Sequence, residues 1–263
     1  MTNRTKEAIE SGNHPLGTWI SIGHSTVAEV NARLDLDFLV IDMEHTTISP
    51  RTIEDMARAV DAAPGETDTV VRVPWNDPVR IKRVIDIGVA GVMVPMIGSA
   101  KEAQDLVDSL RYPPEGIRGI AGSRATGYGR NLEEYVNTAN GSLLTIAQIE
   151  TEEGLENTEE IAEVDGIDAL FVGPADLSGT LGMFAEWDRE EFQDAVEHVI
   201  ETGRETDVPV GTLTVDLDDV ESTVRDGFDF LIAGKDTTQM MESTERAIET
   251  YENALSSSPA SEL

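Results

Sequence analysis

Short apolar runs rich in β-branched residues alternate with longer amphipathic stretches along the whole chain of 263 residues. Such runs are typical of strands, whereas apolar residues spaced by three or four are typical of helices. We predict strands at Gly17–Ile22, Asp37–Ile41, Thr69–Val73, Gly91–Pro95, Leu143–Ile149, Ala169–Val172, Val208–Leu213 and Phe228–Ala233. We predict helices at Ser25–Leu34, after Ser49-Pro50, and at Val79–Ile87, Ser99–Leu110, Glu153–Val164, Asp188–Thr202, Asp216–Arg225 and Thr237–Leu255.

This alternation of strand and helix predicts an α/β fold with a parallel sheet covered by helices. Eight such units in about 250 residues match the size of a (β/α)8 TIM barrel. The main alternative is a doubly wound open sheet, which usually carries a glycine-rich phosphate loop after its first strand. The corresponding segment, Ile20-Ser21-Ile22-Gly23-His24-Ser25, lacks that pattern. No domain boundary stands out, so we expect residues 1–263 to form one barrel domain.

The charge balance is strongly acidic, with 51 Asp and Glu against 19 Lys and Arg and a formal net charge of −32. The acids are dispersed along the predicted helices, and only Lys6, Lys82, Lys101 and Lys235 are lysines. A dispersed acidic surface indicates a halophilic protein, because high salt screens the repulsion between like charges. It also argues against nucleic acid or an anionic membrane as a partner.

The chain contains no cysteine, which excludes a disulfide framework, a thiolate nucleophile and a zinc–thiolate site. Its first residues do not resemble a signal peptide, and no apolar run approaches the 18 residues of a membrane span. We therefore expect a cytoplasmic protein.

Polar and ionisable side chains stand where several of the predicted strands end. They are Asp42, Glu44 and His45 after the second strand, Arg72 in the third, Gln148 and Glu150 at the fifth, and Asp176 after the sixth. In a parallel barrel the C-terminal ends of the strands surround one opening, which we call the mouth. The sequence therefore predicts an active site at the mouth.

Each of these residues has a functional and a structural interpretation. Glu150 and Asp176 suit Mg²⁺ or Mn²⁺, with Co²⁺ as a further option, or they cap the helices that follow. Arg72, in a strand expected to be buried, either clamps a substrate oxygen that becomes negative or forms a structural ion pair. Asp42 and His45 form a carboxylate–imidazole pair that raises the basicity of the ring, or they act as local caps.

Other features near the predicted mouth are less specific. The glycine-rich segment Tyr112–Arg130 is long and irregular, and we expect it to cover the substrate. His24 follows the first strand and is a candidate for substrate contact. Lys235 follows the eighth strand and is the candidate for the competing Schiff-base chemistry, although we interpret it as a surface lysine in a salt bridge.

Taken together, four motifs in order resemble those of the HpcH/HpaI aldolase family. They are Asp42-Met43-Glu44-His45, Val71-Arg72-Val73-Pro74, Gln148-Ile149-Glu150-Thr151 and Gly173-Pro174-Ala175-Asp176-Leu177-Ser178. The Gly17-Thr18-Trp19 opening and the loop around Arg118–Arg124 also fit, so the resemblance spans most of the chain. It implies class II, metal-dependent and reversible aldol cleavage of a 2-keto-4-hydroxy or 2-keto-3-deoxy acid to pyruvate and an aldehyde. The extreme acidity suggests a haloarchaeal-type member.

The resemblance also implies roles for individual residues. Glu150 and Asp176 would bind the metal, Arg72 would meet the pyruvyl keto oxygen, and Asp42 and His45 would form a catalytic dyad. Substrate contacts would come from Trp19, Gln148, Ala175, Leu213 and Arg124. Lys235 departs from the small or apolar residue expected at its position. Family members are commonly homohexamers whose C-terminal helices exchange between subunits.

Two other functions compete with this interpretation. A malyl-CoA or citryl-CoA lyase would use the same barrel and metal, but it should need a basic surface for the phosphates of the coenzyme. A catalytically silent binding barrel is the second alternative. The full set of Asp42, His45, Arg72, Glu150 and Asp176 argues against it.

Overall fold

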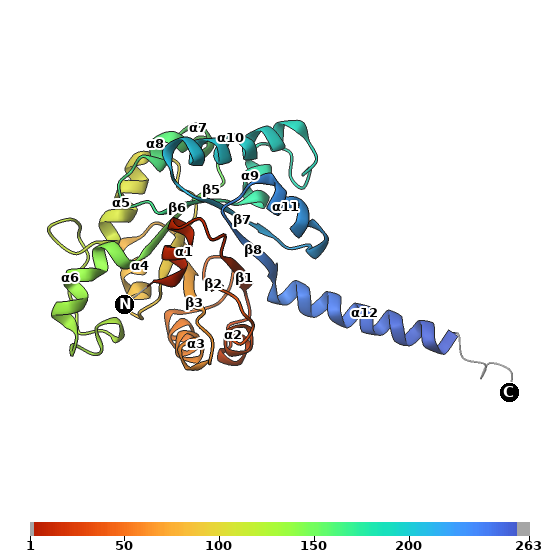
Figure 1. The fold of residues 1–263 in the computed structure, drawn as a ribbon, viewed down its shortest axis with the longest axis horizontal. Helices are drawn as coiled ribbons and strands as arrows, with labels where there is room; N and C mark the ends of the chain where they lie inside the picture. Colours follow the sequence, from red (N-terminus) through yellow and green to blue (C-terminus); the bar gives the residue numbers. More distant parts are fainter. Residues whose placement is uncertain (1–2, 257–263) are drawn as a thin grey trace.

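The chain folds into a closed barrel of eight parallel strands, as seen in a computed structural model that describes residues 3–256 (Figure 1). The strands follow one another around the barrel in chain order, and β8 closes it against β1. The strands are β1(Leu16–Ile20), β2(Phe38–Asp42), β3(Asp68–Arg72), β4(Gly91–Val94), β5(Leu144–Ile149), β6(Ala169–Val172), β7(Val210–Thr214) and β8(Phe230–Lys235). The predicted TIM barrel is confirmed, and each predicted strand overlaps an observed one.

Helices surround the barrel and connect successive strands (Figure 1). They are α1(Arg4–Glu10), α2(Ser25–Asn31), α3(Pro50–Ala62), α4(Pro78–Ile85), α5(Ala100–Leu110), α6(Leu132–Ser142), α7(Glu152–Glu156), α8(Thr158–Ala162), α9(Pro174–Thr180), α10(Glu190–Thr206), α11(Val220–Asp226) and α12(Asp236–Ser256). Short 3-10 turns occur at η1(Arg124–Thr126) and η2(Leu217–Asp219). Ser49 and Asp77 cap α3 and α4 through their side chains, and a proline follows each of them.

Two apolar layers hold the barrel together. Side chains that face inward from the strands, including Phe38, Phe171 and Phe230, fill the interior. Those that face outward pack against the helices in a larger layer. This two-layer burial explains why the strands read as continuous apolar runs in the sequence.

The N-terminal helix α1 closes the end of the barrel opposite the mouth. Ile9 packs with the interior side chains, and Thr5 donates its backbone N–H to the Asp68 carboxylate at the start of β3. The Asn3 amide donates to the carbonyl oxygens of Ala90 and Ser142, at 2.6 and 2.8 Å. The mouth is therefore the end at which polar strand-terminal residues remain available to a substrate.

The irregular segment Tyr112–Arg130 does not lie at the mouth, contrary to the prediction. α5 separates it from β4 and returns the chain to the N-terminal end of the barrel. There the Ala125 N–H donates to the carbonyl oxygen of Asp86, which caps the C-terminus of α4. α6, which was not predicted, then leads into β5.

The C-terminal helix α12 extends away from the barrel (Figure 1). No residue of this helix is buried, and large apolar side chains along it are more than half exposed, namely Met240, Met241, Ile248, Tyr251 and Leu255. The helix therefore does not cover the barrel of its own chain. Within residues 3–256 there is no helix with the length and apolarity that a membrane crossing requires.

Candidate active site

Five of the expected site residues converge at the mouth: Trp19, Asp42, Arg72, Gln148 and Glu150. Asp42 and Arg72 end their strands and stand opposite each other in the β2–β3 register. All five side chains are buried. The barrel topology brings them together because each lies at or just beyond the C-terminal end of a strand.

Arg72 is held on several sides by groups of the protein. Its Nε and Nη2 donate to the two carboxylate oxygens of Asp42 at 3.0 and 2.9 Å, and Nη1 lies 2.9 Å from Oε2 of Glu44. The guanidinium carbon lies 4.5 Å from the centre of the Trp19 ring, so the cation stacks on an aromatic face. A guanidinium has five N–H donors and Asp42 accepts from two of them, so N–H groups on Nη1 and Nη2 remain for another acceptor.

The side chains of Asp42 and His45 do not form the expected pair. Both oxygens of Asp42 face Arg72, and Asp42 contacts His45 only through the backbone N–H of that residue, at 3.4 Å. Burial acts to raise the pKa of Asp42, but the hydrogen bonds and charge of Arg72 outweigh it and hold the pKa below its ordinary value. The reason is positional, because Asp42 ends a strand and points at its cross-strand neighbour.

Glu44 is the carboxylate that faces the imidazole. Its Oε2 lies 3.8 Å from Nε2 of His45 and also contacts Arg72. The Glu44 side chain is largely buried, whereas that of His45 is 65 % exposed. Burial raises the pKa of Glu44, and the neighbouring cationic groups oppose this effect. The motif placed Glu44 near the site, but no sequence signal distinguished its role from that of Asp42.

Glu150 lies in a tightly packed and electrostatically unfavourable position. Its Oε1 accepts the backbone N–H of Met96 at 2.8 Å, and Oε2 accepts from the Gln148 amide. Burial raises the pKa of Glu150 to about 7, and the negative charges of Asp176 and Glu44 act in the same direction. Oε1 of Gln148 is buried and has no hydrogen-bond partner in the described part of the chain.

The backbone around Glu150 is adapted to this arrangement. Met96 has a left-handed conformation, with φ of +58°, that turns its N–H toward the carboxylate. A Cβ at Gly173 would lie 2.6 Å from Nε2 of Gln148 and 2.7 Å from Oε2 of Glu150. Glycine at 173 therefore allows the two side chains to pack beneath the start of α9. Met96 was missed in the sequence, which carries no mark of its conformation.

Three further expected residues lie near this cluster. Ala175 and Asp176 are exposed in the first turn of α9, and Asp176 is close enough for its charge to act on Glu150. Leu213 is partly buried in β7 and packs against the interior side chains of the barrel. His24, another candidate, is exposed and accepts the Thr26 N–H as the cap of α2.

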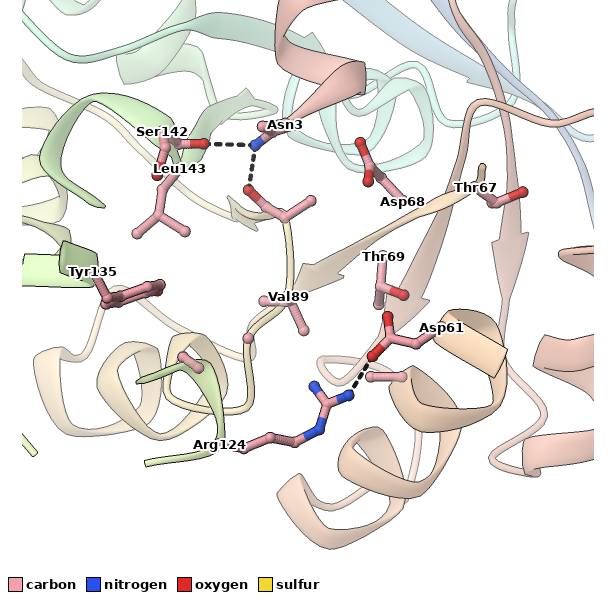
Figure 2. Close-up of a pocket in the computed structure, with 14 residues that line it drawn as sticks. Asn3, Asp61, Thr67, Asp68, Thr69, Val89, Arg124, Tyr135, Ser142 and Leu143 are labelled. Atoms are coloured by element: carbon pink, nitrogen blue, oxygen red, sulfur yellow. Dashed lines mark hydrogen bonds and ion pairs between the residues drawn. The ribbon is translucent and has the colours of Figure 1, made fainter. Parts of the chain in front are cut away.

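Arg124 lies at the opposite end of the barrel and is not part of this cluster. Its guanidinium donates to the Asp61 carboxylate of α3 and to the carbonyl oxygen of Ile87. Arg124 lines a cavity of about 290 Å³ at the N-terminal ends of β3 and β4. Asn3 and Thr69 line the same cavity (Figure 2). Arg124 therefore does not join the other expected site residues, because α5 places the whole Tyr112–Arg130 segment at that end.

Lys235 also differs from its interpretation as a salt-bridged surface residue. It is the last residue of β8 and is partly buried. Its ammonium group has no ion pair and no hydrogen bond to any residue between 3 and 256. The mouth therefore carries a cation that has no partner among residues 3–256.

Comparison with known proteins gives consistent results over nearly the whole chain. The family model described as HpcH/HpaI aldolase/citrate lyase matches residues 16–243. The chain is 36% identical over 247 residues to a 4-hydroxy-2-oxo-heptane-1,7-dioate aldolase of Shigella sonnei. The matched region covers 93% of each protein.

Solved structures give the same result. A family protein of this kind from Burkholderia cenocepacia J2315 matches with a TM-score of 0.91 and 32% identity, over 95% of this chain and 100% of that one. An HpcH/HpaI aldolase from Desulfitobacterium hafniense DCB-2 matches with a TM-score of 0.87 and 28% identity, over 94% and 96% of the two chains.

Proposed function

The chain belongs to the HpcH/HpaI aldolase/citrate lyase family, and we propose that it catalyses the metal-dependent, reversible aldol cleavage of a 4-hydroxy-2-oxo acid to pyruvate and an aldehyde. The observation that carries this proposal is that a cationic and an anionic group lie together at the mouth. A fixed guanidinium with free donors, Arg72, stands in the same cluster as the buried carboxylate of Glu150.

The residues at the mouth fit a divalent cation. Glu150 and Asp176 would hold it, because oxygen ligands suit Mg²⁺ and Mn²⁺ and the two carboxylates repel each other without a cation. No group of three or more acidic or imidazole side chains forms a ready-made metal site among residues 3–256. Further ligands would therefore be water and the carboxylate and keto oxygens of the substrate. When bound, the ion supplies Lewis-acid stabilisation of negative charge on the keto oxygen.

Arg72 supports the same charge from the protein side. Cleavage of the C3–C4 bond leaves an electron pair on the pyruvyl half, and the keto oxygen becomes the oxyanion of an enolate. The N–H groups of Arg72 that Asp42 leaves free can donate to this oxygen. Because Trp19 and two carboxylates already fix the guanidinium, little reorganisation is needed as the charge develops.

His45 is the candidate base for the proton of the C4 hydroxyl group. Its imidazole is exposed toward solvent, and the Glu44 carboxylate lies on one side of it. Removal of this proton allows the C4 oxygen to become the carbonyl of the departing aldehyde. We assign the orientation of the imidazole to Glu44, because Asp42 is committed to Arg72.

Exchange of the pyruvate methyl hydrogens tests this function without knowledge of the aldehyde. The enzyme with Mn²⁺ should exchange these hydrogens with deuterium in D2O, because the enolate is common to all substrates of this class. Arg72→Lys should slow exchange by about 10²-fold, in line with the loss of one oxyanion donor. The absence of exchange by wild-type enzyme with Mg²⁺, Mn²⁺ or Co²⁺ would contradict the proposal.

We also propose that α12 mediates assembly into a homo-oligomer, namely a hexamer. The support is its row of exposed apolar side chains, which includes Ile248 and Tyr251, and its extension away from its own barrel (Figure 1). Burial of these side chains against a second subunit would remove a large apolar surface from water. Light scattering of the full chain at high salt tests this assignment.

A further inference from the structure

Lys235 is unusual among the cationic residues of this protein. Acidic residues outnumber basic ones by 51 to 19, so a cation has many potential partners. The other cations that lack a hydrogen bond or ion pair between residues 3 and 256 are exposed, apart from Lys82 on α4. Of these two partly buried lysines, Lys235 is the one at the C-terminal end of a barrel strand.

An irregularity in β8 sets the position of Lys235. Gly17 pairs with Ile232 and Trp19 pairs with Lys235, so β8 gains one residue relative to β1. Gly234, with φ of +79°, occupies this bulge, and a Cβ there would collide with the Gln239 side chain. Side chains along a strand alternate between its two faces. Ile232 faces the barrel interior, and the extra residue makes Lys235 face the interior as well, on the same side as its pairing partner Trp19.

This position places the ammonium group beside the candidate active site. Lys235 pairs with Trp19 on the adjacent strand, and the backbones of neighbouring strands lie about 4.8 Å apart. The ring of Trp19 stacks on Arg72. The nearest acidic residue in the chain, Asp236, accepts the backbone N–H groups of Ser21 and Ile22 and does not pair with the lysine. A partly buried ammonium group without a partner costs free energy unless an anion completes its surroundings.

The anion that the mouth can take is part of the substrate. The pyruvyl half already has binding groups. Arg72 is assigned to its keto oxygen, and a cation held by Glu150 and Asp176 would bind its carboxylate and keto oxygens. A second anionic group would therefore lie on the aldehyde half. A lysine suits such a group, since a flexible ammonium binds an anion as a point charge.

We propose that Lys235 binds an anionic group, most simply a carboxylate, on the aldehyde half of the substrate and so selects dicarboxylic 4-hydroxy-2-oxo acids. This inference rests on the proposed aldolase function. Lys235 is then a specificity-determining residue and takes no part in bond cleavage. In a protein with a charge of −32, it also supplies a local attraction for a doubly charged substrate.

The test compares two aldehydes as partners of pyruvate in condensation by the full chain with Mn²⁺. Succinate semialdehyde carries the anionic group, and butanal is a neutral aldehyde of the same chain length. Wild-type enzyme should prefer the anionic aldehyde in kcat/KM. Lys235→Met should reduce this preference by about 10- to 100-fold, as expected for loss of a charge-assisted hydrogen bond, and Lys235→Arg should restore most of it. The salt concentration is held constant because screening changes the effect.

Lys82→Met is the matched control, because it removes a partly buried, unpaired lysine from a helix outside the site. Its preference should equal that of wild type. An unchanged preference in Lys235→Met would overturn the proposal, as would an equal loss with both aldehydes, which indicates a structural role. Exchange of the pyruvate methyl hydrogens distinguishes failure of the Lys235 assignment from failure of the aldolase function. If exchange occurs but the anionic aldehyde is not preferred, the assignment of Lys235 fails; if exchange is absent, the aldolase function fails and the assignment fails with it.

Discussion

Replacement of Glu150 by glutamine should stabilise the metal-free protein although it removes a candidate metal ligand. The ionised carboxylate is 2% exposed and lies near the charges of Asp176 and Glu44. Glutamine keeps an oxygen for the Met96 N–H and removes the charge. Rotation of the Gln148 amide would offer its unpartnered Oε1 to the new NH2 group, so the variant leaves no added polar atom without a partner.

The magnitude follows from the shift of the pKa of Glu150 from 4.5 to about 7. The folded state retains a proton that the unfolded state loses between these values, so the free energy of unfolding of wild type falls as the pH rises through this window. The loss amounts to about 3 kcal/mol at pH 8 and to less than about 1 kcal/mol at pH 5. Glu150→Gln cannot ionise and should not show this loss.

Urea unfolding of chelated protein at pH 5 and pH 8, at constant high salt, measures both values. Addition of Mn²⁺ at pH 8 should remove most of this difference, since an ion at 100 times its Kd stabilises wild type by about 3 kcal/mol and should hardly affect the variant. Asp176→Asn is the matched control. Asp176 is exposed, so this change should also abolish the effect of Mn²⁺, but it should stabilise the metal-free protein less than Glu150→Gln does, because it removes the repulsion between the two carboxylates and leaves the buried charge of Glu150 in place.

If Glu150→Gln is less stable than wild type at pH 8 without metal, burial of the ionised Glu150 carboxylate does not destabilise the fold. Equal stabilisation of wild type and of Glu150→Gln by Mn²⁺ would refute the assignment of Glu150 as a ligand.

Four other expectations concern catalysis, salt and assembly. Arg72→Ala should reduce aldol cleavage by about 10²–10³-fold and destabilise the fold by about 3–5 kcal/mol, since it leaves Asp42 buried without its partner; urea unfolding and pyruvate release measure the two effects. If Glu44 acts through the imidazole, the double variant Glu44→Gln with His45→Ala should cleave no more slowly than His45→Ala alone, and additive losses would argue against this. The melting temperature should rise by several degrees from dilute buffer to several molar KCl, because the dispersed acids repel one another, and a flat profile would contradict halophilic adaptation. Deletion from Thr237 onward should dissociate the assembly, and a full-length monomer at high salt by light scattering would exclude this role of α12.

The fold could be predicted from the sequence because each strand is buried on both faces and reads as an apolar run. Candidate site residues could also be predicted, since polar groups at the ends of such runs must meet at the mouth of a parallel barrel. Asp42, Arg72 and Glu150 were identified in this way. Their mutual contacts could not be derived, because the pairing of Asp42 with Arg72 depends on the register between β2 and β3.

The remaining differences have local physical causes. Arg124 was placed at the wrong end of the barrel because the position of a loop depends on whether a helix precedes it. Lys235 was expected in a surface salt bridge. The bulge at Gly234 instead directs its side chain to the same face as that of Trp19, and the pattern of apolar residues does not reveal a bulge. The left-handed backbone of Met96 likewise depends on tertiary contacts rather than on residue type.

Pyruvate release from a 4-hydroxy-2-oxo dicarboxylic acid, measured with chelated enzyme before and after addition of Mn²⁺, tests whether this protein is a metal-dependent aldolase. We expect no release by the chelated protein, full release after Mn²⁺, and no pyruvate adduct on Lys235 after treatment with borohydride. Full activity in excess EDTA, or a trapped adduct on Lys235, would contradict metal-dependent aldol cleavage at this site.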